Sequence, residues 1–178
     1  MMGEARISFP TGPNEIERLK ALLELSLHAG EPDPALDAIC QTARERFDVP
    51  IALVTLLYHE RQLLRGRSGT DGTETPRSLA FCNHTILADE IFVVLDATAD
   101  PRFADNPLVT GEPHIRFYAG APLTYLHGIR FGALCLIDRK PRRFSLGDRA
   151  ELAELADTVV SAVAAGQFRD LLSIRPSG

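Results

Sequence analysis

A thiol and an imidazole stand two residues apart in the segment Phe81–Leu87, which reads FCNHTIL. A thiolate at Cys82 could act as a nucleophile, because the start of a short helix favours a negative charge. His84 or His114 could serve as an axial ligand of haem iron, but a single histidine near a pocket is more often hydrogen-bonded or exposed. We therefore expect no haem here, and we place Cys82 and His84 in the wall of a candidate small-molecule site.

A second pair of polar side chains, Arg116 and Tyr118, lies two residues apart in a predicted strand, so both project from the same face. Arg116 could bind an anionic group there, and Tyr118 could stack on a ligand or donate a hydrogen bond to it. Alternatively, Arg116 pairs with Asp96 or Asp100 and holds the preceding loop to the sheet, which is the interpretation we favour. Asp96, Asp100 and Asp105 lack the spacing of an EF-hand, so we expect loop caps and no metal site.

Aromatic side chains accompany these polar groups. Phe81, Phe103 and Phe117 would either line a cavity or fill it, and the sequence does not separate the two arrangements. The candidate ligand-binding site therefore comprises seven residues: Phe81, Cys82, His84, Asp96, Phe103, Arg116 and Tyr118.

The elements that must position these residues follow from capping signals and apolar periodicity. Helices are predicted at 14–29, from Pro34 onward, at 78–87 and from Ser145 to about Phe168. Strands are predicted at 51–58, 61–67, 92–95, 115–125 and 129–138. Adjacent strands joined by short turns at His59-Glu60 and His127-Gly128 indicate hairpins, and hence an antiparallel sheet. The Gly-rich stretch 66–76 is predicted to be a flexible connector, with the position of a lid.

These elements predict an α+β fold in which the terminal helices cover one face of the sheet. Loops and the short helix would cover the other face, leaving a cavity beneath them. We expect residues 1–13 to form a flexible N-terminus, residues 14–168 a single domain with its terminal helices, and residues 169–178 a tail.

Composition limits the classes of partner. The formal net charge is −5, which argues against binding to the phosphate backbone of nucleic acid, and the basic run Arg139–Arg143 is short enough for a solvated turn. No apolar run approaches the length of about 20 residues that a membrane span needs. The three cysteines have no paired spacing, so a reducing compartment fits, and we expect a cytoplasmic protein.

Four motifs now occur in a recognisable order: FCNHTIL at 81–87, VVLDATADPRFADNPLV at 93–109, IRFYAGAPL at 115–123, and GIRFGALCLIDRKPRRFS at 128–145. Together they resemble the GAF domains of bacterial signalling proteins over roughly residues 35–165. The resemblance implies a six-stranded antiparallel sheet, a small-molecule pocket on one face and dimers formed through terminal helices. It also implies a role as input module for a histidine kinase, a cyclase or a transcription regulator.

Particular subclasses of the family fit less well. Cyclic-nucleotide-binding members carry an Asn-Lys pair, a Phe and then Asp-Glu, whereas this chain has Asp138-Arg139, Phe144 and Asp148-Arg149. An ion pair between Arg139 and Asp148 would still be possible. Bilin-binding members carry an Asp-Ile-Pro stretch that is absent here.

An enzymatic alternative within the family is free methionine sulfoxide reductase, in which one thiolate attacks and a second cysteine resolves the sulfenic acid. Cys82 could be the first thiol, but Cys135 lies far along the chain in an apolar strand, and no cluster of cysteines is seen. We therefore expect a non-enzymatic sensor of an unidentified small molecule, which forms a homodimer and signals through its terminal helices. The alternatives are an interaction or dimerisation module with a vestigial pocket, and the reductase.

Overall fold

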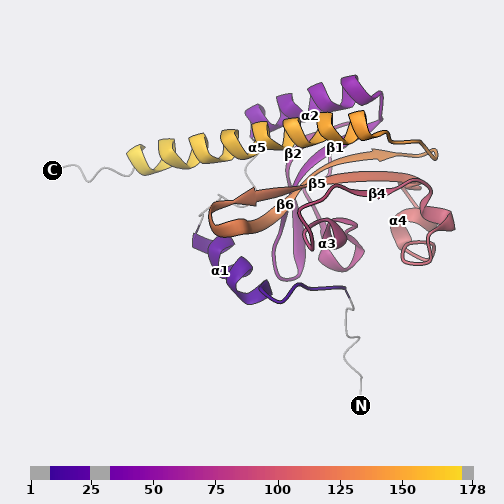
Figure 1. Cartoon of the computed structure of the whole chain (residues 1–178), viewed down its shortest axis with the longest axis horizontal. Coiled ribbons are helices and arrows are strands. Elements are labelled where there is room, and N and C mark those ends of the chain that lie inside the picture. Colours follow the sequence, from indigo (N-terminus) through magenta and orange to yellow (C-terminus); the bar gives the residue numbers. More distant parts are fainter. Residues whose placement is uncertain (1–8, 25–32, 174–178) are drawn as a thin grey trace, which may run out of the picture.

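The computed structural model describes residues 9–24 and 33–173, and of residues 167–173 only the backbone. Within these residues, six strands form one antiparallel sheet in the order β3-β2-β1-β6-β5-β4 (Figure 1). The strands are β1 (Ile51–Leu57), β2 (Arg61–Ser68), β3 (Glu74–Pro76), β4 (Phe92–Val94), β5 (Phe117–Tyr125) and β6 (Ile129–Asp138). The helices are α1 (Glu15–Glu24), α2 (Pro34–Phe47), α3 (Cys82–Thr85), α4 (Pro107–Thr110) and α5 (Leu146–Ser173). The α+β fold and its antiparallel sheet are as predicted.

Two hairpins form the centre of the sheet, and both were predicted. β1 pairs with β2, and β5 pairs with β6. The turn between β5 and β6 places His127 and Gly128 at positive φ, the combination that tight hairpin turns require. β1 and β6 join the hairpins, and Thr55 and Gly132 lie at adjoining positions of this pair. A Cβ on Gly132 would collide with the carbonyl group of Thr55, so only glycine permits the strands to approach this closely.

The sheet separates two hydrophobic cores. Residues that alternate along each strand belong to different cores, as the pleat requires: Val54 and Leu134 face one side, whereas Leu53 and Cys135 face the other. Since β1 and β6 are buried on both faces over most of their length, their sequences are largely apolar and show no polar–apolar alternation.

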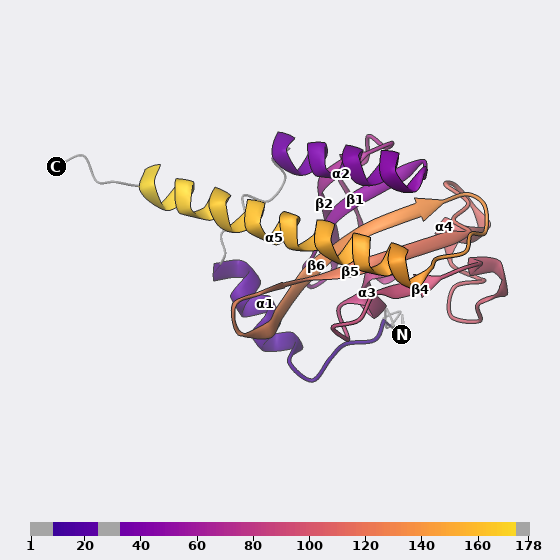
Figure 2. The same cartoon turned by 45° about the horizontal axis from the view of Figure 1, so that its top comes forward.

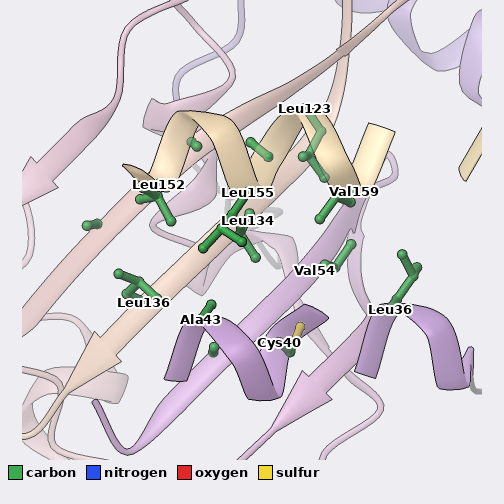
Figure 3. Packing of buried hydrophobic residues seen from close by; sticks show 14 of the residues in the cluster. Leu36, Cys40, Ala43, Val54, Leu123, Leu134, Leu136, Leu152, Leu155 and Val159 are labelled. Atoms are coloured by element: carbon green, nitrogen blue, oxygen red, sulfur yellow. The ribbon is translucent and has the colours of Figure 1, made fainter. Parts of the chain in front are cut away.

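The first core lies between the sheet and the helices α2 and α5, which run side by side across one face (Figures 1 and 2). Figure 3 shows the close packing of Leu152, Leu155 and Val159 from α5 with Leu134 of β6 and Cys40 of α2. Cys40 is fully buried there as a small core residue.

Both of these helices begin at capping residues that the sequence predicts. Asp33 accepts hydrogen bonds from the backbone amides of Ala35 and Leu36, with Pro34 at the first position of α2. At the start of α5, Ser145 Oγ accepts from the amide of Asp148 at 3.0 Å, and Asp148 Oδ2 accepts from the amide of Ser145 at 2.9 Å. This reciprocal pair is a capping box.

The second core lies on the opposite face, beneath α3, α4 and the connecting loops, and α1 lies at one end of that face (Figure 1). Among the described residues, no helix combines the length and the apolar character that a membrane span requires.

Several predicted boundaries differ from the structure. The predicted connector 66–76 contains strand β3, which was missed because its residues are polar and flanked by Gly and Pro. The predicted helix 78–87 is a 3₁₀ turn, Arg77–Leu79, followed by the single turn of α3. α5 continues past Phe168 to Ser173, and the part of the first predicted helix after Glu24 lies outside the described residues. Asp148 caps α5 through the amide of Ser145, and the ion pair suggested between Arg139 and Asp148 is not found among the described residues. Arg142 instead lies 3.3 Å from the carboxylate of Asp138.

Candidate functional site

Two thiols and a phenol meet in the second core. Cys82 Sγ at the start of α3 lies 3.2 Å from Cys135 Sγ on β6 and 3.1 Å from the hydroxyl of Tyr118 on β5. The Tyr118 hydroxyl also lies 3.4 Å from Cys135 Sγ. All three side chains are almost completely buried, with exposed fractions of 1–2 %. We call Cys82, Cys135 and Tyr118 the thiol–phenol cluster.

Two threonines complete the hydrogen bonding of this cluster. Thr55 Oγ1 donates to Cys82 Sγ at 3.4 Å or to the carbonyl oxygen of Ala133 at 3.3 Å, and its single proton can serve one of them at a time. Thr85 Oγ1 lies 2.8 Å from the Tyr118 hydroxyl. Cys82 Sγ therefore has three neighbours that can donate a proton toward it, which makes it the best-placed acceptor in the cluster.

The pKa values of the two thiols shift in opposite directions for this reason. Burial alone would raise the pKa of Cys82, but hydrogen bonds from Cys135, Thr55 and Tyr118 outweigh it and lower the pKa of this thiol. Burial raises the pKa of Cys135 well above its ordinary value, and its hydrogen bond to Cys82 raises it further. Cys82 is thus the more acidic thiol of the pair, and Cys135 can donate a proton to it.

The sequence interpretation missed this pair and was wrong on this point. It set Cys82 and Cys135 apart because they are distant along the chain and because the run around Cys135 is apolar. β6 is covered on both faces, so its sequence has no alternation that would show which side Cys135 faces. Only the tertiary fold brings the two sulfurs together.

The predicted aromatic residues pack beside the cluster. The rings of Phe81 and Phe103 stack with centroids 4.1 Å apart, and the Tyr118 ring lies 5.3 Å from that of Phe81. His84 is half-buried, with its ring 5.3 Å from the ring of Phe92. Phe81 and Phe103 are each 3 % exposed, so almost none of their surface is accessible to water and they fill the space. Phe117 faces the first core.

The two remaining predicted residues lie at the edge of this region. Asp96 accepts from the Thr98 amide at 3.1 Å and from the Thr98 hydroxyl at 2.7 Å, so it caps a short turn. Arg116 donates to the carbonyl oxygens of Val109 at 2.9 Å and Ile115 at 3.0 Å. The favoured pairing of Arg116 with Asp96 or Asp100 is therefore wrong. Arg116 does hold the loop to the sheet, but through backbone carbonyls, since Asp100 pairs with Arg102 at 2.7 Å.

A buried arginine that the sequence did not single out anchors α3. Arg77 is fully buried; it donates to Asn83 Oδ1 at 2.8 Å, to the Tyr58 carbonyl oxygen at 3.1 Å, and to the carboxylate of Glu15. Asn83 in turn donates to the Arg77 carbonyl oxygen at 2.7 Å. The Phe9 ring lies against the guanidinium group, 4.4 Å from Cζ. Arg77 thus connects α3 to α1 and to the end of β1.

The carboxylate of Glu15 lies between two arginines. Arg18 donates to it through two nitrogens, each at 2.9 Å, and Arg77 donates from the other side. Burial alone would raise the pKa of Glu15, but the hydrogen bonds and charges of Arg18 and Arg77 lower it to about 2. A cleft of about 210 Å³ opens beside this group, lined also by Ile86, His127 and Arg130.

In residues 9–24 and 33–173, no group of three or more His, Cys, Asp or Glu side chains is arranged to hold an ion.

The family of the chain follows from a comparison with known proteins. The model of the GAF domain family matches residues 31–163, which is most of the chain. The chain belongs to the GAF domain family.

One curated relative is similar to this GAF domain over most of the chain. Over 133 residues the domain is 46 % identical to a cyclic di-GMP phosphodiesterase of Pseudomonas aeruginosa, covering 75 % of this chain. The chain spans only 23 % of the length of that relative.

Solved structures show the same fold. The GAF domain of a phosphoenolpyruvate-protein phosphotransferase from Coxiella burnetii aligns with a TM-score of 0.63 at 15 % identity, covering 89 % of this chain and 99 % of that one. A free methionine-R-sulfoxide reductase from Thermoplasma acidophilum aligns with a TM-score of 0.59 at 23 % identity, covering 72 % and 89 %. These identities support a shared fold and carry no conclusion about activity.

Proposed function

We propose that this GAF domain is a non-catalytic sensory module, in which a chemical event at the thiol–phenol cluster alters the seating of α5. The observation that supports it most is the arrangement of β6. Cys135 belongs to the cluster on one face, and its neighbours Leu134 and Leu136 pack in the α5 core on the other. A shift of β6 caused on one side would therefore change the packing on the other.

The length of α5 suits the output of such a module. Its core-facing residues recur at Leu152, Leu155, Ala156, Val159 and Val163, the spacing of one helix face. The helix then runs on to Ser173, past the edge of the sheet (Figure 2). Because the relative from Pseudomonas aeruginosa is a cyclic di-GMP phosphodiesterase, an enzyme of that class is the first output to test.

Amide hydrogen exchange of α5 tests the coupling. Tyr118→Phe removes one hydroxyl from the cluster without changing the shape of the core, and we expect faster exchange in residues 146–166. Thr98→Val is the control and should leave α5 unchanged, because it removes an exposed hydroxyl that donates to Asp96 in a turn outside both cores. Equal exchange in both variants would contradict the proposal.

A small-molecule signal remains part of the proposal, and so does the homodimer. Native mass spectrometry of freshly purified protein, beside the denatured mass, should show a retained ligand. Ile16 and Leu23 of α1 are 66 % and 68 % exposed, which supports assembly through this helix together with α5. A monomer in sedimentation equilibrium at high concentration would exclude the homodimer.

One observation favours the interaction module as a second candidate. Phe81, Phe103 and Tyr118 fill the space where the family would hold a ligand, so a ligand of that kind would need them to move. An empty protein in native mass spectrometry that binds a partner protein tightly would favour this candidate. The reductase is tested directly by turnover of methionine sulfoxide, with Cys82→Ser as the control.

A further inference from the structure

We propose that Cys82 and Cys135 form a redox-active dithiol, which hydrogen peroxide oxidises to an intramolecular disulfide. The inference rests on the proposed function for its meaning as a signal, but its chemistry can be tested separately. Three features carry it: the distance between the sulfurs, their hydrogen-bond partners, and the elements on which they lie.

The two sulfurs need to move only a short distance to form a disulfide bond. The two sulfurs are 3.2 Å apart, and a disulfide bond is about 2.05 Å long, so they must approach by roughly 1 Å. Cys135 is held in the middle of β6, between β1 and β5. Cys82 lies on the single turn of α3, which is the element free to make that adjustment.

The hydrogen bonds assign the two thiols different steps. Cys82 Sγ lies within hydrogen-bond distance of Thr55 Oγ1, the Tyr118 hydroxyl and Cys135 Sγ, each of which can donate to it, so its thiolate attacks one oxygen of the peroxide. An S–O bond forms, the O–O bond breaks, and hydroxide leaves and takes a proton to become water. Cys82 is then a sulfenic acid. The Cys135 sulfur attacks the Cys82 sulfur, an S–S bond forms, the S–O bond breaks, and a second water leaves with the Cys135 proton.

The reaction is balanced by these species alone. Two thiols and one molecule of hydrogen peroxide give one disulfide and two molecules of water. Two electrons pass from the sulfurs to the peroxide, and a dithiol reductant such as dithiothreitol returns them.

Burial sets the rate of this reaction. Cys82 and Cys135 are 2 % and 1 % exposed, so even a small neutral oxidant reaches them only when the α3 segment opens locally. The hydrogen bonds of Asn83 to the carbonyl oxygens of Arg77 at 2.7 Å and Ala80 at 3.0 Å hold that segment closed. We therefore expect Asn83→Ala to accelerate oxidation several-fold while the product stays the same.

The third cysteine of the chain is an internal control. Cys40 lies on α2 in the other core, and burial raises the pKa of its thiol to about 12. It should take no part in the reaction, so Cys40→Ser should oxidise as the unchanged protein does. Cys135→Ser should stop at the sulfenic acid of Cys82, which dimedone captures, and Cys82→Ser should leave Cys135 unmodified.

The decisive measurement is the intact mass of the unchanged protein. Protein treated with peroxide, then denatured and alkylated, should carry one alkyl group in place of three, and three again after dithiothreitol. Three alkyl groups after peroxide, or a mass gain from sulfinic acid on Cys82, would overturn the inference. This measurement needs no variant, so a variant that fails to fold does not affect it.

Hydrogen exchange of α5 in the same oxidised sample separates this inference from the proposed function. Disulfide formation with altered exchange in residues 146–166 supports both. Disulfide formation with unchanged exchange supports the dithiol and contradicts the coupling to α5. Absence of the disulfide overturns the dithiol, and the Tyr118→Phe measurement then still tests the coupling.

Discussion

The hydroxyl of Tyr118 lies directly over Gly120, two residues further along the same strand. A Cβ added to Gly120 would collide with that hydroxyl and lie 2.6 Å from Thr85 Oγ1. The sequence alone does not show that the group over this glycine is a side chain of the candidate site. The absence of a side chain at Gly120 is what makes room for the hydrogen bond between Tyr118 and Thr85.

Replacement of Gly120 by alanine should therefore destabilise the fold by about 1–3 kcal/mol, the usual cost of overpacking a core. Denaturation in urea measures this change in the free energy of unfolding. Gly72→Ala is the control, because the added Cβ would meet Leu64 Cδ1 at 3.5 Å, an ordinary contact. The double variant with Tyr118→Phe should recover part of the loss, and an unchanged midpoint for Gly120→Ala would contradict the described packing.

Removal of the buried guanidinium by Arg77→Leu should cost about 3–5 kcal/mol, because Glu15 and the carbonyl oxygen of Tyr58 lose a buried partner. The exposed pair Arg61–Glu74 provides the control, since its side chains are 61 % and 48 % exposed. Arg61→Ala should cost no more than about 1 kcal/mol. Urea denaturation compares the two variants, and equal losses would show that Arg77 is not an anchor.

The attachment of α1 should depend on pH. The pKa of Glu15 is lowered from 4.5 to about 2, so its charge stabilises the folded state above pH 4.5. That contribution is lost as the pH falls from 4.5 toward 2. Glu15→Gln should be less stable than the unchanged protein at pH 6, and the difference should narrow in this acidic range. Urea denaturation at a series of pH values measures it, and a difference that stays constant would count against the assignment.

Truncation of a core-facing side chain tests whether α5 packs in the core of the domain. Leu152 is fully buried, and Leu152→Ala should cost about 2–5 kcal/mol. Glu154 is exposed on the opposite side of the helix, and Glu154→Ala should change stability by no more than about 0.5 kcal/mol. Thermal and urea denaturation check both values. A small loss for Leu152→Ala would mean that α5 is not part of the domain core.

Local signals in the sequence predicted most elements of this fold. Asp33 and Ser145 identify the starts of α2 and α5, and the turns at His59-Glu60 and His127-Gly128 identify both hairpins. These signals act between residues close together in the chain, so they can be read without the tertiary structure.

The candidate site was predictable only in part. The structure brings Phe81, Cys82, Phe103 and Tyr118 together as the motifs suggest, but their partners Cys135 and Thr55 come from strands distant in the sequence. Pairing of β1 with β6 creates that proximity, and no local pattern encodes it. Arg77 was missed because an arginine in a loop is ordinarily solvated.

The alternation of β6 has a consequence for how such domains diversify. Ala133, Cys135 and Ile137 belong to the core of the site, and Leu134 and Leu136 to the core of the long helix. From Ala133 to Ile137, odd-numbered and even-numbered positions of this strand thus pack in different cores. A substitution at Cys135 or Ile137 changes side-chain contacts beneath α3, whereas one at Leu134 or Leu136 changes side-chain contacts in the core that holds α5. One strand can in this way accept changes on one face of the sheet while the residues on its other face stay the same.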